Sequence, residues 1–163
     1  MPVVETVKYE TYTDDEKILV RDYLLKNHPA FFTYLMVTYH TGIRPKEVLA
    51  LKIGDVDFKR KLILIKPDMQ LENSKTKNIR IVPVNDHLAA LLESHITGYN
   101  EKEMFLFGSP FEAGVGNRGR MNGCYGSARP DYFKPSFTQV KRDTATKLWK
   151  TIVKDKLIMR IKS

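Results

Sequence analysis

Apolar residues recur at helical spacing near the start of the chain, and the pattern predicts two helices there. The first covers residues 13–26, because Thr13 and Glu16 fit the capping-box pattern and an apolar stripe follows them. A His-Pro pair breaks this helix. The second helix, over residues 30–40, is apolar on several faces, which predicts burial on more than one side, and Gly42 is its expected C-cap.

The period of the pattern changes in the middle of the chain, where two short runs rich in β-branched residues replace the helical spacing. Residues 62–65 and 79–84 form these runs and a polar stretch separates them, so we expect two strands of a small antiparallel sheet. Pro83 ends the second strand, because proline lacks the N–H group that a sheet requires. A further helix follows, capped by Asn85 or Asp86.

Helical and strand patterns both fail over residues 98–135. Glycines at positions 108, 114, 116, 119, 123 and 126 and prolines at 110 and 130 mark an irregular insertion, and such loops are usually functional or disordered. A last helix then carries an apolar stripe formed by Val140, Ala145, Leu148, Trp149, Ile152 and Val153. Its other face carries Lys147, Lys150 and Lys154. We expect the tryptophan to belong to the core rather than to stack on a base.

Together these elements predict an α+β fold that is mostly helical with a small antiparallel sheet. A chain of 163 residues, 42% of them hydrophobic, is long enough for about one domain with an ordinary core. It has no run of 18 or more apolar residues and no signal-peptide pattern, so we expect a soluble, cytoplasmic protein without membrane contact. The single Cys124 forms no internal disulfide and lacks the companions of a zinc site, and we expect no metal.

The formal charge of +8 suggests an anionic partner, but the distribution of charge matters more than the total. Residues 134–163 hold nine Lys or Arg against two Asp, a net of +7. The preceding 133 residues carry 18 basic against 17 acidic residues, a net of +1. Charge alone favours equally a solvated basic helix and a surface that faces nucleic acid.

The stretch TGIRPKEVLALKIGDVD places an arginine where a helix disfavours one. Arg44 directly precedes Pro45, which opens a short third helix that extends to about residue 53. A cation there opposes the positive end of the helix dipole and costs about 0.3–1 kcal/mol. Two explanations are open. Arg44 pairs with a nearby acid such as Glu47 or Asp55, or it binds a phosphate, whose oxygens match the guanidinium fork.

The same stretch resembles the first signature of the tyrosine recombinase or phage integrase family. Six positions agree at fixed spacing, namely Thr41, Gly42, Arg44, Glu47, Leu51 and Asp55. Downstream, SKTKNIRIVPV is similar to the β-hairpin of that family, with a lysine in a polar turn before a strand that ends in Val-Pro. The resemblance implies an integrase-like catalytic domain that cleaves and rejoins DNA strands, so we expect a function in site-specific recombination or DNA integration.

The resemblance also implies roles for individual residues. Arg44 contacts the scissile phosphate and stabilises the charge that grows on it, and Lys75 protonates the leaving 5′ oxygen, with Lys77 a close second. We expect Lys77 and Arg80 to contact DNA beside this catalytic pair. From the residues alone, Lys75 is equally consistent with a solvated turn residue. In the family a tyrosine nucleophile forms a 3′-phosphotyrosine link, and no cofactor is required.

Part of the family pattern has no counterpart in this sequence. The histidines at positions 28, 40, 87 and 95 are followed three residues later by Phe, Ile, Ala and Gly, so no His-x-x-Arg motif occurs. The last helix resembles the element before that motif. We therefore expect residues 1–163 to be a truncated, partial catalytic domain that neither cleaves nor joins DNA alone. We interpret the tyrosines of the insertion as loop or packing residues, namely Tyr99, Tyr125 and Tyr132.

Three functions remain open from the sequence. The first is an incomplete catalytic domain of a DNA strand-exchange enzyme, and the second is a non-catalytic DNA-binding module or a decayed integrase. The third is a basic α+β scaffold with no nucleic-acid role, whose charged end only aids solubility. The resemblance favours double-stranded DNA as the partner. It also implies homo-tetramers on DNA for family members, and leaves the oligomeric state of this chain open.

Overall fold

The structure is a computed structural model that describes residues 12–67, 78–110 and 132–152. Its helices are α1 (Asp14–Asn27), α2 (Pro29–Thr41), α3 (Pro45–Ala50), α4 (Asp86–Ile96) and α5 (Arg142–Lys150). One antiparallel sheet contains β1 (Val56–Asp57), β2 (Leu62–Ile65) and β3 (Arg80–Pro83), in the order β1-β2-β3. The predicted α+β class, mostly helical with a small antiparallel sheet, is confirmed.

The ends of the first two helices follow from the residues that the sequence places there. Thr13 Oγ1 accepts a hydrogen bond from the Glu16 N–H group, and the Glu16 carboxylate accepts one from the Thr13 N–H group at 2.8 Å, which completes the predicted capping box. Gly42 ends α2 with a φ of 66°, a left-handed conformation that glycine adopts without steric cost. This turn leads the chain directly into the segment around Arg44.

The sheet has one buried face and one exposed face. β2 and β3 pair with Ile65 opposite Arg80, and Pro83 closes β3 at the edge of the sheet, where its missing N–H group is tolerated. Ile63 is fully buried, whereas Ile81 is 60% exposed on the other face. The sequence pattern did not predict β1, because two residues are too few to show an alternation of apolar and polar positions.

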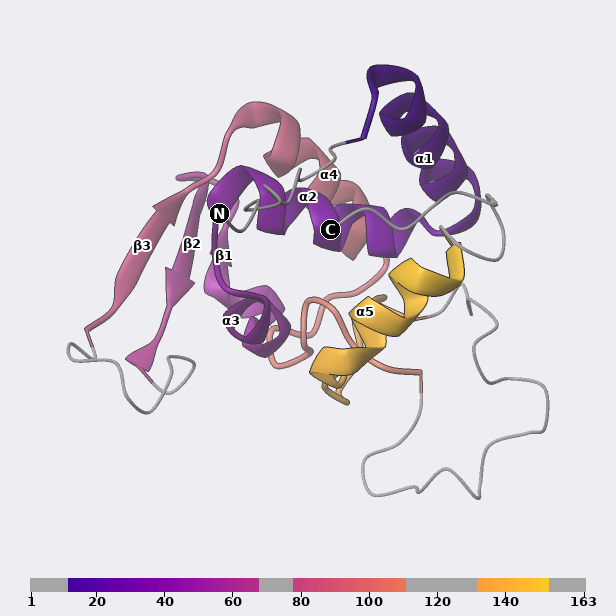
Figure 1. Cartoon of the computed structure of the whole chain (residues 1–163). Helices are drawn as coiled ribbons and strands as arrows, with labels where there is room; N and C mark the ends of the chain where they lie inside the picture. The colour runs from indigo at the N-terminus through magenta and orange to yellow at the C-terminus, as the bar shows by residue number, and fades with distance from the viewer. Residues whose placement is uncertain (1–11, 68–77, 111–131, 153–163) are drawn as a thin grey trace, which may run out of the picture.

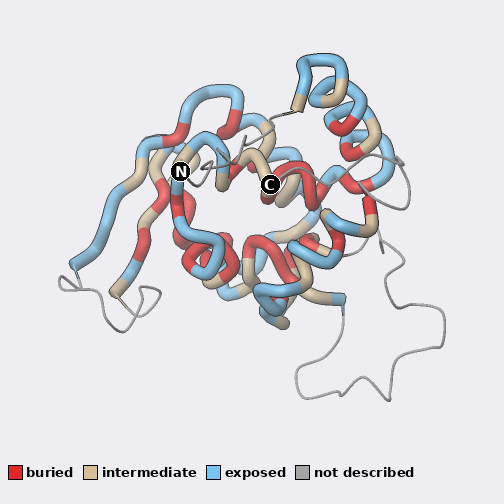
Figure 2. Tube along the Cα trace, viewed as in Figure 1, coloured by how far each residue is buried: buried red, intermediate tan, exposed pale blue. Residues whose placement is uncertain are grey.

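Helix α2 lies at the centre of the molecule and packs against α1, α3 and α4, with the sheet to one side (Figure 1). Figure 2 shows that buried positions run along α2 and α3 and along the inner face of α4. The buried apolar residues of α2 are Ala30, Phe31, Phe32, Tyr34 and Val37. They lie on several faces of the helix, as predicted, so α2 is the element around which the others are assembled.

Parts of the predicted insertion, residues 98–110 and 132–135, contribute to the core. Phe107 and Phe133 are fully buried, and the Phe133 ring centroid lies 5.0 Å from that of Tyr34. Backbone hydrogen bonds join residues 105–109 to residues 133–138, and we call these two segments the flank pairing. The flank pairing contains isolated β-bridges instead of regular strands, so no periodic sequence pattern predicted it.

Helix α3 ends at Ala50, about three residues earlier than predicted. Leu51 adopts an extended conformation, and its carbonyl oxygen accepts a hydrogen bond from the Leu106 N–H group at 2.8 Å. The Ile53 N–H group donates to the Met104 carbonyl at 2.9 Å. Pairing with the insertion therefore takes the chain out of the helix, and a 3-10 turn, η1 (Ile53–Asp55), leads it into β1.

The apolar stripe of α5 faces the core. Leu148 and Ile152 are buried, and the partly buried Trp149 ring meets the Tyr12 ring edge-on at 6.2 Å, in agreement with a packing role. Lys147 and Lys150 are exposed on the other face, while positions 153 and 154 lie outside the described residues. In the described part of the chain, every helix is too short or too polar to span a membrane.

Candidate anion site

Arg44 is the N-cap residue of α3, and its side chain is exposed. Pro45 follows at the first helical position, where a missing N–H group leaves no helical hydrogen bond unmade. Among the residues that the structure describes, none forms a hydrogen bond or ion pair with the Arg44 guanidinium. The Arg44 cation is therefore accessible from solvent, with its five N–H donors directed at no described acceptor.

Glu47, the first acid considered as a partner for Arg44, binds a different cation. Its side chain is only 1% exposed, and its two carboxylate oxygens accept hydrogen bonds from Arg80 Nη1 at 3.3 and 3.1 Å. Arg80 is the first residue of β3, and 48% of its side chain remains exposed. A buried carboxylate needs a paired cation to offset its lost hydration. The Arg80 contact provides that pairing from the sheet.

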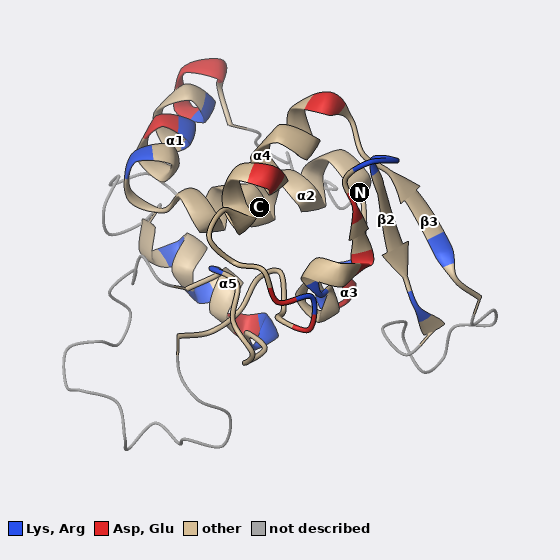
Figure 3. Ribbon diagram, turned by 180° about the vertical axis from the view of Figure 1, so that it is seen from behind, with Lys and Arg blue, Asp and Glu red and all other residues tan. Residues whose placement is uncertain are grey.

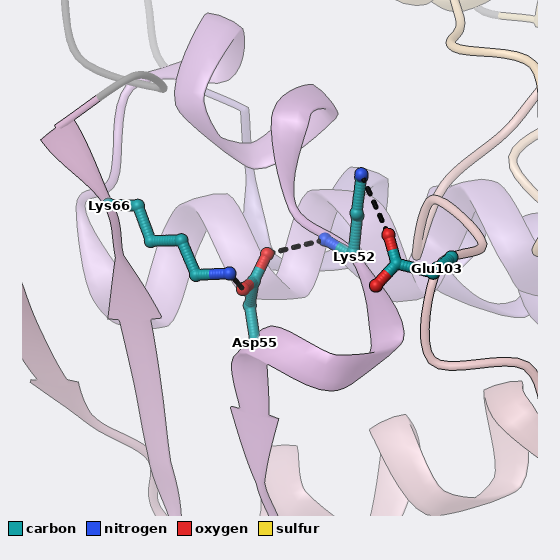
Figure 4. A network of polar contacts seen from close by, with 4 residues as sticks. All are labelled: Lys52, Asp55, Lys66 and Glu103. Carbon is teal, nitrogen blue, oxygen red and sulfur yellow. Dashed lines mark hydrogen bonds and ion pairs between the residues drawn. The ribbon is translucent and has the colours of Figure 1, made fainter.

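Asp55, the second acid, is also occupied (Figure 4). Its carboxylate is 2% exposed, accepts a hydrogen bond from the Lys52 N–H group at 2.9 Å, and lies 3.1 Å from Lys66 Nζ. The Lys52 side chain turns away and forms an ion pair with Glu103 at 3.2 Å. The explanation of Arg44 as the partner of a neighbouring acid therefore has no support in the described structure.

The two cations that bind these carboxylates lie at the same end of the paired strands β2 and β3. Lys66 directly follows β2 and Arg80 opens β3, and we call this pair the hairpin stem. The predicted site residues Lys75 and Lys77 belong to the segment between them, which lies outside the described residues. Arg80, predicted to contact DNA, binds Glu47 through Nη1, and Nε and Nη2 make no hydrogen bond to a described residue. Part of its guanidinium is thus still available.

The sequence patterns did not point to Lys66, and they indicated Glu47 and Asp55 as positions of the family signature and as possible partners of Arg44. A signal was present, because a cation directly follows the β2 run and another opens the β3 run. The register that places Ile65 opposite Arg80 was needed to bring these cations to the same end of the hairpin. Which acid each of them binds depends on tertiary packing and could not be inferred from spacing.

Basic residues are not spread evenly over the fold (Figure 3). Figure 3 shows Lys and Arg on α1, α3, α5 and β3, whereas α2 and α4 contain no Lys or Arg. On α5, Lys147 forms an ion pair with Asp143 at 2.9 Å, and this partner lowers the pKa of Asp143. Positive charge thus lies on α1 and α5 as well as next to Arg44 and at the hairpin stem.

Two of the histidines, His28 and His95, are largely removed from solvent. His28 is buried at the start of α2, and desolvation lowers its pKa. His95 donates through Nε2 to the Leu106 carbonyl at 2.6 Å, and burial lowers its pKa to about 4. Both rings are thus neutral near pH 7. No group of three or more His, Cys, Asp or Glu suited to a metal ion occurs in residues 12–67, 78–110 and 132–152.

The chain matches the model of the phage integrase family over residues 10–160. Among solved structures it is similar to a XerA recombinase, with 17% sequence identity and a TM-score of 0.56 over 96% of this chain. It is also similar to a Tn1549 transposon integrase solved in complex with circular intermediate DNA, with 15% identity and a TM-score of 0.53 over 98% of this chain.

The two solved structures are longer than this chain. The match covers 47% of the XerA chain and 48% of the Tn1549 integrase chain, so the 163 residues span about half the length of each. At these identities the similarity establishes a common fold. No curated protein sequence matches the chain.

Proposed function

The chain belongs to the phage integrase family, and from this premise we propose that it is part of the catalytic domain of a tyrosine recombinase. Such an enzyme cleaves and rejoins DNA strands in site-specific recombination or integration. In this proposal the partner is double-stranded DNA, and the described residues contribute a phosphate site centred on Arg44. A cytoplasmic location belongs to the same proposal.

One observation carries the proposal, namely the exposed Arg44 guanidinium without a described partner. Two buried acids lie three and eleven positions later in the chain, Glu47 and Asp55, and each is bound to a cation of the hairpin stem. An arginine kept only for stability would be expected to take one of them. An arginine kept for a ligand is expected to stay unpaired until the ligand binds, and phosphate oxygens match its planar donors.

The chemistry of strand exchange explains why such a group is useful. Attack on a phosphodiester places negative charge on the non-bridging oxygens, and a preorganised guanidinium stabilises that charge. The leaving 5′ oxygen needs a proton, and we assign this role to Lys75, which lies between the two cations of the hairpin stem in sequence. Lys77 and the free nitrogens of Arg80 are proposed to contact the neighbouring DNA backbone.

Two further observations support DNA as the partner. The Tn1549 integrase, which shares the fold, was solved in complex with circular intermediate DNA. The net charge of this chain is +8, and described basic residues lie on α1, α3, α5 and β3, whereas α2 and α4 contain none. Contacts with the phosphate backbone release counterions, so a surface of this kind gains affinity for DNA at low salt.

We further propose that this chain alone binds DNA without cleaving it. The sequence contains no His-x-x-Arg motif. Tyr99 and Tyr132 pack against the core, and Tyr125 lies outside the described residues. Incubation with a labelled duplex followed by denaturing electrophoresis should therefore show neither cleavage nor a covalent protein–DNA species. A covalent species would contradict this part of the proposal.

Fluorescence anisotropy with a labelled duplex tests the phosphate site. We compare the unmodified chain with Arg44→Ala, Lys75→Ala and the matched control Lys46→Ala. Lys46 is exposed two residues from Arg44, so its variant removes the same charge from the same surface. We expect Arg44→Ala to weaken binding about tenfold or more, because a hydrogen bond to a charged group contributes about 1.5–3 kcal/mol.

The controls distinguish a phosphate site at Arg44 from general electrostatic attraction between the basic chain and DNA. We expect Lys46→Ala to weaken binding less than about threefold, since it removes one long-range charge only. Equal losses for Arg44→Ala and Lys46→Ala would mean that DNA is held by total charge, without a site at Arg44. Absence of salt-dependent binding to the duplex would favour the basic scaffold that the sequence left open.

A further inference from the structure

Strand β3 is the outer strand of the sheet and has a neighbouring strand on one side only. The strand order is β1-β2-β3, and no other described segment pairs with the far side of β3. Figure 1 shows β3 at the outer margin of the molecule, and Figure 2 shows most of its length as exposed. An edge strand of this kind presents backbone N–H and C=O groups that a further strand can bind.

The register shows which backbone groups of β3 face the open edge. The Val84 N–H group donates to the Lys61 carbonyl at 2.8 Å, and this bond continues the register of β2 and β3. Hydrogen-bonded and non-bonded pairs alternate along an antiparallel ladder, so Val82, two residues earlier, also bonds to β2. Ile81 lies between these positions and faces Leu64 in a non-bonded pair. Its N–H and C=O groups therefore point away from β2, to the open edge.

The positions two residues away on either side of Ile81 complete this row of backbone groups. Ile79 directly precedes β3, and Pro83 is its last residue. By the same alternation their backbone groups face the open edge as well. Pro83 contributes a carbonyl group but no N–H group. The edge thus offers donors at Ile79 and Ile81 and acceptors at all three residues.

The side chains on the outer face of the same strands are apolar. Ile79 and Ile81 are 62% and 60% exposed, and Leu62 and Leu64 of β2 are partly exposed beside them. Arg80 points to the opposite face of the sheet, where its ion pair with α3 holds it. Proteins commonly place an outward charge on an edge strand to prevent further pairing, and the outer face of β3 carries none.

From this geometry we infer that β3 is a pairing surface for the β3 strand of a second copy of the chain. In a two-fold antiparallel arrangement centred on Ile81, each Ile81 N–H group donates to the Ile81 carbonyl of the other copy. Each Ile79 N–H group then donates to the Pro83 carbonyl of the other copy. Two three-stranded sheets become one six-stranded sheet. The inference goes beyond the proposed function and does not depend on the phosphate site.

A second copy fits this edge because the edge is self-complementary. The missing N–H group of Pro83 falls opposite Ile79, so a single acceptor on each copy stays without a donor. Arg80 of one copy lies opposite Val82 of the other, which keeps like charges from facing each other directly. The two Ile81 side chains meet across the two-fold axis, and β-branched pairs of this kind stabilise a sheet.

Sedimentation equilibrium without DNA tests whether the pairing occurs. Each copy carries a net charge of +8, so repulsion opposes the dimer and salt should favour it by screening that repulsion. We expect a monomer–dimer equilibrium that shifts to the dimer with rising protein concentration and with rising salt. DNA binding responds to salt in the opposite direction. A chain that stays monomeric at every concentration and salt would overturn the inference.

A pair of matched variants locates the interface. Ile81→Lys places a charge at the centre of the proposed pairing and should raise the dissociation constant of the dimer about tenfold or more. The control, Ile18→Lys, makes the same exchange on α1, where Ile18 is 47% exposed. It adds only general repulsion and should raise the constant less than about threefold. Equal effects would mean that the copies associate through total charge and exposed apolar area, which contradicts pairing at β3.

Amide hydrogen exchange, followed by nuclear magnetic resonance, tests the pairing in the unmodified chain. The Ile81 amide should exchange rapidly in dilute solution and slowly in concentrated solution, because its N–H group is bonded only in the dimer. The Val82 amide is bonded within the sheet, so it should be protected at both concentrations. A dimer in which the Ile81 amide still exchanges rapidly would assemble through another surface, and the inference would be wrong.

Discussion

The hairpin stem and the flank pairing both join distant parts of the chain, but different forces hold them. The flank pairing is stabilised by backbone hydrogen bonds above fully buried rings such as Phe107 and Phe133. The hairpin stem is held by ion pairs from half-exposed cations to buried acids. Apolar burial is strong and non-directional, whereas a charged pair contributes less stability but fixes geometry. The first region therefore stabilises the core, and the second holds the ends of β2 and β3 against the segment that follows Arg44.

The largest expected effect is at the flank pairing. Phe107→Ala should lower the free energy of unfolding by about 3–5 kcal/mol, because it leaves a cavity between the rings of Tyr34 and His95. Urea denaturation followed by circular dichroism measures this change. Phe137→Ala is the control, since that ring is 62% exposed on the same flank and should contribute little. Similar losses in the two variants would contradict the assignment of the core.

The second effect depends on pH and concerns His95, which binds the Leu106 carbonyl of the same flank. Burial lowers its pKa from 6.5 to about 4. Between these two pH values His95 binds a proton in the unfolded chain but stays neutral in the folded chain. Stability should therefore fall between pH 6.5 and pH 4, by up to about 3 kcal/mol.

The difference between the chain and its His95→Gln variant isolates this contribution. Glutamine keeps an N–H donor for the Leu106 carbonyl but does not titrate in this range. We expect the variant to show a smaller loss of stability between pH 6.5 and pH 4, measured by urea denaturation at each pH. Parallel pH curves would mean that the His95 ring is hydrated in the folded state.

A third change tests how closely the two flanks approach. A Cβ atom on Gly108 would lie 2.1 Å from Ser136 Oγ and 2.8 Å from its backbone nitrogen. Gly108→Ala should therefore separate the flanks and reduce stability by about 1–3 kcal/mol. Thermal unfolding measures the change. An unaltered melting temperature would mean that the flanks do not pair this closely.

The smallest expected effect on stability is at the hairpin stem. Arg80→Lys keeps a cation for Glu47, and the arginine is half exposed, so we expect a loss of about 1 kcal/mol or less. Duplex affinity should fall more visibly than stability in this variant. If Arg80→Lys destabilised the chain as strongly as Phe107→Ala, the two regions would not differ in the way described above.

Sequence patterns predicted the elements that depend on local chemistry. The capping box at Thr13, the glycine that ends α2 and the paired strands β2 and β3 all follow from neighbouring residues. The flank pairing depends on contacts between segments about 30 residues apart in sequence, and the early end of α3 on contacts about 50 residues apart. Sequence periodicity cannot report such contacts. For this reason the irregular stretch after α4 gave no sign that its two ends enter the core.

In the candidate site, too, sequence patterns predicted some features and missed others. Arg44 was found because its position conflicts with the helix that follows it, and conflicts between local preference and position often mark function. Glu47 and Asp55 were recognised as its possible partners and as positions of the family signature, but not as ligands of Arg80 and Lys66. Their pairing with Arg80 and Lys66 depends on the register of β2 and β3 and on the burial of α3, and both become visible only in three dimensions.

The central claim is that Arg44 binds a DNA phosphate, and the salt dependence of affinity tests it most directly. The slope of log affinity against log salt is measured for the unmodified chain, Arg44→Ala and Lys46→Ala on the same duplex. Loss of one neutralised phosphate should reduce the slope by about 0.9 for Arg44→Ala, while Lys46→Ala leaves it nearly unchanged. An unchanged slope for Arg44→Ala would contradict the claim.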